Sequence, residues 1–257
     1  MIALLAALAL AQDPDEARTD GLAVEGHRIQ AVSGGTGLGI GDKLVVGKDG
    51  GVNVLTVTVR VRAGDVQFGG SLPFAAYRVP EDGRDGDLGN VALWAHYRLP
   101  TEWEQHVGLR LHFAVAEHSA WTWANSAEEL WPGAGVDAYW EARTGRDPLR
   151  WMLRGALGVH ATRGQEPFPD THAKFQAAGG LDATVVGPFG AVAEMTVQYW
   201  DTSPWEFAGL LRVDPTAGLR LRAGFVLPIA VWAGLSPTDQ PAGAREATLL
   251  FDVTLAP

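Results

Sequence analysis

The chain has 257 residues, of which 47% are hydrophobic and only 19% are charged, below the roughly 25% typical of soluble domains. It contains no cysteine, which excludes disulfides, thiol nucleophiles and cysteine metal sites. Its formal net charge is −10 and no basic cluster is present, which argues against a nucleic-acid partner and against a polybasic membrane anchor.

The N-terminal segment, residues 1–11, is a short apolar run that ends in the small-x-small pattern Ala9-Leu10-Ala11. Such a run is too short to span a bilayer, which takes about 20 residues. It has the features of a signal peptide cleaved after Ala11, although no basic residue precedes it; the alternative is an ordinary apolar helix start. Residues 12–21 are acidic and polar and are expected to form a flexible lead-in to a domain covering 22–257.

From about residue 50 onward, apolar and polar residues alternate with the period of two that is typical of β-strands. In one segment, for example, Leu109 and Leu111 alternate with Arg110 and His112. A first strand near 22–33 has the poorest alternation. The other strands are expected at about 52–63, 65–76, 90–99, 106–116, 136–143, 149–161, 174–185, 190–200, 205–213, 219–231 and 246–255. The total of about twelve is even, as in single-chain outer-membrane barrels.

The segments between these strands alternate in length. Tight turns are expected at 63–65, 187–188 and 214–218, where Gly and Pro provide turn chemistry. Longer loops are expected at about 34–51, 78–87, 117–135, 162–172 and 234–244. The glycine-rich stretch 37–42 faintly matches a nucleotide-binding fingerprint but does not open a helix, so it is interpreted as part of a loop. Short turns at one end and long loops at the other are characteristic of outer-membrane barrels.

Two features distinguish a membrane barrel from a soluble sandwich or a lipocalin-like barrel, whose apolar faces point inward. The polar faces carry charges at mid-strand, such as Arg110, Arg154 and Glu194, and the apolar faces match the 9–11 residues that cross a bilayer obliquely. We therefore predict an all-β fold, a transmembrane antiparallel up-and-down β-barrel of about 12 strands in the outer membrane of a Gram-negative bacterium. Its expected partners are outer-membrane lipid and the barrel-insertion machinery, although the chain ends in Pro257 instead of an aromatic residue.

Three stretches, 72–77, 86–99 and 218–229, carry a family resemblance. They resemble the outer-membrane transporter-like proteins grouped with the MetA pathway of phenol degradation, with Asn90 where those proteins usually have Asp. The resemblance covers about a third of the chain and implies a channel or a transporter of hydrophobic compounds.

The inward parity of the predicted strands is charged. It carries Arg60, Arg62, Arg98, Arg110, Arg143, Arg150, Arg154, Arg212, Arg220, Arg222, Glu141, Asp182, Glu194, Glu206, Glu246 and Asp252. Charges inside a barrel are costly unless they are paired or hydrated. They form either a salt-bridged lumen that makes a narrow barrel rigid or a water-filled constriction that selects by charge.

Neither a metal site nor enzymatic activity is expected. His96, His112 and His160 share the inward parity, but their positions along the predicted strands place them at different heights. A lipid hydrolase would need a Ser–His pair on neighbouring strands, whereas His118 and Ser119 are adjacent at a loop edge. No cofactor is expected.

The segment containing Trp121, Trp123 and Trp131 is the most distinctive loop. It is expected either to lie at the mouth of the barrel or the outer leaflet, or to cap neighbouring loops. The function predicted from the sequence is a passive channel or transporter for small solutes, apolar or aromatic ones included. The alternatives are a structural or interaction barrel with a closed lumen, and a membrane-embedded lipid enzyme.

Overall fold

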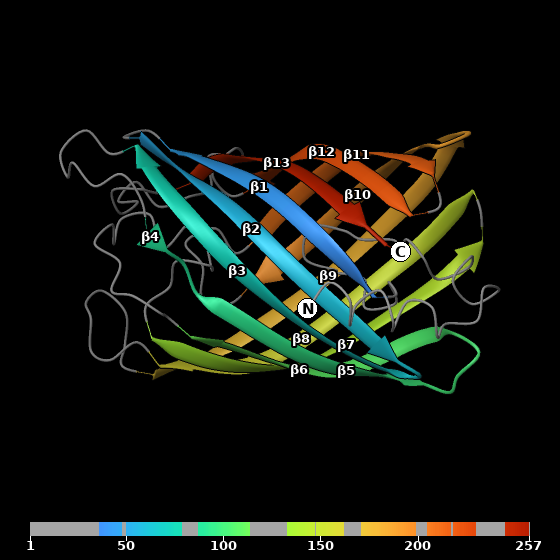
Figure 1. The fold of residues 1–257 in the computed structure, drawn as a ribbon, viewed down its shortest axis with the longest axis horizontal. Coiled ribbons are helices and arrows are strands. Elements are labelled where there is room, and N and C mark those ends of the chain that lie inside the picture. The colour runs from blue at the N-terminus through green and yellow to red at the C-terminus, as the bar shows by residue number, and fades with distance from the viewer. Residues whose placement is uncertain are drawn as a thin grey trace, which may run out of the picture.

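The chain folds into one closed antiparallel β-barrel whose strands run obliquely to its long axis (Figure 1). The computed structural model describes residues 36–47, 50–78, 87–113, 133–146, 148–161, 171–198, 205–216, 218–229 and 245–256. The strands are β1 (Gly37–Gly47), β2 (Gly50–Ala63), β3 (Val66–Arg78), β4 (Asp87–Leu88), β5 (Val91–Leu99), β6 (Glu104–Phe113), β7 (Ala134–Arg146), β8 (Leu149–Ala161), β9 (Thr171–Val186), β10 (Phe189–Gln198), β11 (Trp205–Thr216), β12 (Leu219–Pro228) and β13 (Arg245–Leu255). Pairing of β1 with β13 joins the first strand to the last and closes the ring.

The barrel has twelve strand positions because β4 and β5 share one of them. Leu88 of β4 pairs with Phe74 of β3, and β5 pairs with the preceding part of β3, from Val66 to Ser71. The two short strands are therefore one strand of the wall that is interrupted at Gly89 and Asn90. The predicted twelve-stranded up-and-down barrel is confirmed.

The first strand differs from the prediction. β1 occupies residues 37–47, inside the segment that the sequence analysis assigned to a loop at 34–51, and the strand expected near 22–33 lies outside the described residues. The outward positions Leu38, Ile40 and Leu44 do alternate, but the inward positions between them include Gly39 and Gly41. The glycines suggested a turn, whereas in the barrel they are inward strand positions without side chains.

The two ends of the barrel have different connections. At one end, here called the short-turn end, the connections are 64–65, 100–103, 147–148, 187–188 and 217–218. Gly64 and Gly187 open two of these turns with positive φ values of 62° and 52°, a conformation that glycine adopts without strain. At the other end, the long-connection end, the strands are joined by 79–86, 114–133, 162–170, 199–204 and 229–244. The link between β1 and β2, residues 48–49, is the exception at that end, where a long loop was expected.

The barrel is apolar outside and charged inside. Leu109, Leu157 and Leu211 point outward and are 58%, 64% and 69% exposed, whereas the inward Asp137 and Glu141 are at most 1% exposed. This arrangement is the reverse of that in a soluble barrel and requires a hydrocarbon environment around the wall. Together with the twelve-stranded closed fold, it makes this chain an outer-membrane β-barrel of the Gram-negative type.

Several predictions concern residues that the structure does not describe. The predicted signal peptide of residues 1–11, the predicted lead-in of 12–21 and the residues Trp121, Trp123 and Trp131 all lie outside the described ranges, as do His118 and Ser119. No helix among the described residues is long and apolar enough to cross a membrane.

The outward face predicts a position-specific effect on stability. Leu109 lies in the middle of β6 on the lipid side, so Leu109→Arg should lower the free energy of unfolding by about 2–4 kcal/mol. Denaturant titration of the barrel refolded in phospholipid vesicles measures this change, with Leu109→Met as the matched apolar control. Equal stability of the two variants would contradict a lipid-facing β6.

Candidate functional site in the barrel lumen

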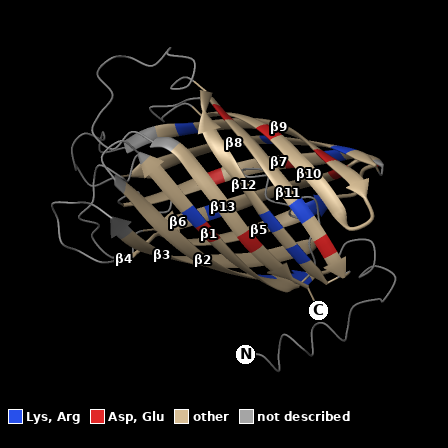
Figure 2. Cartoon of the chain, turned by 90° about the horizontal axis from the view of Figure 1, so that it is seen from above, with Lys and Arg blue, Asp and Glu red and all other residues tan. Residues whose placement is uncertain are grey.

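The inward face of the described strands carries more cations than anions. Twelve cationic side chains face the lumen: Lys43, Arg60, Arg62, Arg98, Arg110, Arg143, Arg150, Arg154, Lys174, Arg212, Arg220 and Arg222. Eight acidic ones do so: Glu104, Asp137, Glu141, Asp182, Glu194, Glu206, Asp214 and Asp252. Figure 2 shows the two signs interspersed along the strands. The described lumen therefore has a net positive charge, opposite in sign to the whole chain at −10.

The structure places every predicted lumenal residue on the inward face except Glu246, whose side chain is not described. It adds Lys43, Glu104, Asp137, Lys174 and Asp214 to the set. Lys43 and Asp214 were missed because their segments were assigned to a loop and a turn. Asp137 and Lys174 had the correct parity in the sequence, so alternation alone was sufficient to find them.

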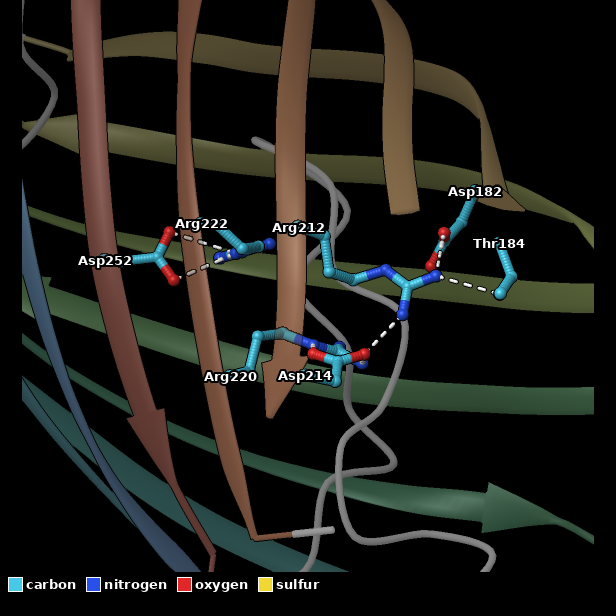
Figure 3. Close-up of polar contacts among 7 residues, drawn as sticks. All are labelled: Asp182, Thr184, Arg212, Asp214, Arg220, Arg222 and Asp252. Atoms are coloured by element: carbon cyan, nitrogen blue, oxygen red, sulfur yellow. Dashed lines mark hydrogen bonds and ion pairs between the residues drawn. The ribbon is translucent and has the colours of Figure 1, made fainter. Parts of the chain in front are cut away.

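A polar network near the short-turn end is here called the arginine ladder: Asp182, Arg212, Asp214, Arg220, Arg222 and Asp252 (Figure 3). Arg212 of β11 donates to Asp182 of β9 at 2.8 Å and also pairs with Asp214. Arg220 of β12 donates to both oxygens of Asp214, at 2.7 and 3.0 Å. Asp214 is therefore shared by two guanidinium groups.

The ladder continues onto the next pair of strands. Arg222 and Asp252 are directly opposite each other in the register of β12 and β13, and the Arg222 Nε atom lies 2.9 and 3.0 Å from the two carboxylate oxygens. The side chain of Asp252 is 21% exposed and that of Asp214 is 19% exposed, compared with 2% for Asp182. Two carboxylates of the ladder are thus partly accessible, whereas the third is fully buried.

An apolar patch adjoins the ladder on the same inner wall. It consists of Met152, Ala178, Val192, Leu210 and Leu250, which pack together on β8, β9, β10, β11 and β13. Leu210 is the inward residue next to Arg212 on β11, and Leu250 is next to Asp252 on β13. Charged and apolar rows therefore lie side by side inside the barrel, an arrangement that the purely polar inward parity expected from the sequence did not include.

A second polar cluster lies towards the long-connection end. Asp137 of β7 accepts from Arg110 of β6 at 2.6 Å and from Lys174 of β9 at 3.0 Å. The ring nitrogens His112 Nε2 and His160 Nδ1 lie 2.7 Å apart. The expectation that the inward histidines lie at different heights was wrong for this pair.

The register explains the contact between these two histidines. His112 and His160 both pair with the same residue, Gly135, from opposite sides. A Cβ atom at Gly135 would meet both rings, so the missing side chain is what lets them touch. Within the described residues, no group of three or more His, Asp or Glu side chains is arranged to hold a metal ion.

Between these two clusters, Arg154 of β8 contacts residues of both neighbouring strands, β7 and β9. Its guanidinium group pairs with Glu141 of β7, donates to Gln176 of β9 at 3.0 Å, and lies 4.7 Å from the centre of the Tyr139 ring. Tyr139 in turn contacts His96 of β5, with 3.2 Å between the hydroxyl oxygen and Nδ1. A continuous polar strip therefore covers the inner face from β5 to β9.

These contacts run along the wall. The pair Arg212 and Asp214 lies within β11, and each other pair named above joins strands that are adjacent or next but one in the ring, such as β6 with β7 or β9 with β11. Inward glycines allow the long side chains to lie flat. Gly190 lies beneath the guanidinium group of Arg212, where a Cβ atom would collide with it. None of the described pairs crosses the barrel axis.

The short-turn mouth is hollowed. A cavity of about 570 Å³ is lined by Glu102, Trp103, Glu104, Arg143, Thr144, Gly145 and Arg150. Arg143 and Glu104 face each other across β7 and β6, with a charged-atom separation of 3.7 Å, and the Trp103 side chain is half exposed. The mouth therefore offers both charged groups and an exposed aromatic ring to a solute.

The ladder predicts a cost for removing its shared carboxylate. Asp214→Asn leaves Arg212 and Arg220 without the anion between them and should lower the free energy of unfolding by about 2 kcal/mol. The value is below the roughly 3–5 kcal/mol of a fully buried pair because Asp214 is partly exposed. Denaturant titration in vesicles measures the change. The control Asp65→Asn, in an exposed turn, should stay within about 0.5 kcal/mol; equal losses would contradict a shared carboxylate.

Comparison with known proteins gives the fold. No family model matches the sequence, and no curated protein sequence is similar to it. Among solved structures, the barrel is similar to the NanC porin, with a TM-score of 0.60 and 12% sequence identity over 86% of this chain and all of that one. It is also similar to the KdgM porin, solved alone and in complex with disordered oligogalacturonate, with a TM-score of 0.51 and 13% identity over 85% of this chain and 98% of that one. The chain thus has the fold of an outer-membrane porin.

Proposed function

We propose that this protein is a passive outer-membrane channel that favours small organic anions. The observation that carries the proposal is the excess of twelve cations over eight acids on the described inner wall, together with the apolar patch beside the arginine ladder. A solute with a carboxylate and an apolar body can place its charge beside Arg222 and its body against Leu250, which are the partly exposed arginine of the ladder and the partly exposed residue of the patch. Guanidinium groups suit carboxylates because their N–H donors match the two oxygens.

The balance of lumenal charge supports the same preference. Twelve cations and eight acids face the described lumen, whereas the chain as a whole is acidic. A channel wall with one excess sign raises the local concentration of counter-ions and lowers that of ions of its own sign. Anions should therefore enter more readily than cations.

The direction of the ion pairs supports a route through the lumen. Pairs that follow the wall neutralise buried charge without bridging the axis, and the glycines beneath them keep the side chains flat. The short-turn mouth combines the cationic Arg143 and Arg150 with the ring of Trp103, much as the interior has an apolar patch beside charged residues.

The apolar patch also bears on the expectation of apolar or aromatic solutes that the resemblance to the MetA-pathway proteins implied. That patch supports an apolar body on the solute, whereas the excess of cations in the described lumen favours a negative charge on the same molecule. An aromatic carboxylate satisfies both. Membership of the MetA-pathway group stays a prediction.

A structural barrel with a closed lumen is the second candidate, and the burial of its charges favours it. Asp137, Glu141, Lys174 and Arg220 are all at most 3% exposed. Charges that are this well covered rigidify the wall whether or not solutes pass. Conductance separates the two candidates.

Ion selectivity gives the first test. In a planar bilayer with a potassium chloride gradient, the purified barrel should conduct, and its zero-current voltage should have the sign of chloride preference. A correctly folded barrel without measurable current would establish the closed-lumen candidate instead. Preference for potassium would contradict the role of the lumenal cations.

The ladder gives the second test. Arg220→Gln combined with Arg222→Gln should reduce benzoate flux into vesicles while leaving benzyl alcohol flux unchanged, because the substitutions remove charge and leave the apolar patch intact. Arg60→Gln combined with Arg62→Gln is the matched control, since it also removes two lumenal charges but on β2, a strand without ladder residues. Equal effects of the ladder and control variants would remove the ladder from the route.

The glycine beneath Arg212 gives the third test. Gly190→Val should push the guanidinium group off the wall and towards the axis, which lowers the single-channel conductance. Gly155→Val is the control, because nothing lies within 4 Å of a Cβ atom at that position. If both variants conduct as the parent does, the ladder side chains do not border the route.

A further inference from the structure

One ionisable side chain points the wrong way for a membrane barrel. Within the strand residues whose side chains are described, Asp42 is the only Asp, Glu, Lys, Arg or His on the outward parity. Its neighbours on β1 at the same parity, Ile40 and Leu44, are 44% and 40% exposed, whereas Val45, at the opposite parity, is fully buried on the inside. The position is in the middle of β1, Gly37–Gly47.

The register on both sides confirms that Asp42 faces lipid. It pairs with Phe251 of β13 and Leu55 of β2, which are 52% and 43% exposed on the outer surface. No irregularity interrupts either ladder there, since the register shift of β1 with β13 occurs at Val46 and Gly47. A slip of one residue would bury Leu38, Ile40 and Leu44 in the lumen, so the orientation is fixed.

A second polar group lies next to it on the same surface. Asn53 of β2 pairs with Leu44, two positions along β1 from Asp42, so the two side chains are diagonal neighbours. The Oδ1 atom of each is covered by its own chain and has no hydrogen-bond partner among the described residues, so the polar atoms left at the surface are Asp42 Oδ2 and Asn53 Nδ2. A carboxylate and an amide with unsatisfied oxygens are costly in hydrocarbon, where no water can replace the missing donor.

We propose that the outer surface of β1 and β2 around Asp42 and Asn53 is an interface with a second copy of this chain. A carboxylate offers acceptors alone, whereas the amide of Asn53 offers two donors. A patch that holds both is self-complementary: in a two-fold arrangement, each Asp42 accepts from Asn53 of the other copy. The surrounding Ile40, Val57 and Phe251 supply apolar contact around the pair.

A second copy suits this patch better than another occupant. Lipid tails carry no donors, and the headgroups lie away from the middle of a strand. The interface is also independent of the channel proposal, because both side chains lie on the outside of the wall and all the ladder residues lie inside. Loss of the interface should leave the conductance of each barrel unchanged.

Cysteine cross-linking in membranes tests the interface directly, since the natural chain has no cysteine. Ile40→Cys, next to Asp42, should form a disulfide-linked dimer in proteoliposomes on mild oxidation. Leu153→Cys, an outward residue of β8 that lies away from β1 in the ring, is the matched control and should not. Equal cross-linking at the two sites would overturn the proposal.

The polar pair is tested in the same background. Asp42→Leu and Asn53→Leu should each reduce the cross-linked fraction of Ile40→Cys about tenfold, whereas Asp42→Asn, which keeps a polar partner for Asn53, should largely retain it. Heat-modifiable migration on gels verifies that each variant has folded. If Asp42→Leu dimerises as the parent does, or if the parent barrel is monomeric in vesicles, the interface is wrong.

Discussion

Hydrogen bonding of the backbone in hydrocarbon is the constraint on which this structure depends. Every strand must pair on both sides, because an open edge cannot be satisfied by lipid. The first and last strands, β1 and β13, therefore pair with each other. Closing the ring fixes the register, and the register with its period of two decides which side chains face lipid and which face the lumen.

Once the register is fixed, the lumenal chemistry follows from rows of residues on adjoining strands. Arg222 and Asp252 form an ion pair because they are opposite each other on β12 and β13, and Arg143 faces Glu104 for the same reason. Contacts between strands that are next but one need a gap in the row between them. Gly135 provides that gap for His112 and His160, and Gly190 makes room for Arg212 on its way to Asp182. A glycine on the intervening strand thus determines which polar side chains come into contact.

Alternation in the sequence was sufficient to predict the membrane barrel, eleven of its twelve strands and the inward parity of the charges. It failed for β1, where the inward positions 39 and 41 are glycines and the alternation is therefore not visible. Lys43 and the outward Asp42, which lie on the same strand, were missed with it. It also failed for contacts that depend on register. The positions of His112 and His160 along their own strands gave no indication that both pair with Gly135, because that pairing is set by the closure of the whole ring. The apolar patch was missed because residues such as Met152 and Leu210 were not separated from their outward neighbours.

The lumen must meet two opposing demands. Buried charges stabilise a wall only when they are paired, yet a charge that is fully neutralised exerts little pull on a passing ion. The arginine ladder meets the first demand, since its three arginines are paired with three aspartates, and the excess of cations over acids in the described lumen as a whole meets the second. Pairing therefore fixes each guanidinium group against the wall, and the unmatched excess sets the sign of the field. In such a barrel, rigidity comes from the ion pairs along the wall, and selectivity comes from the excess of cations over acids on the same wall.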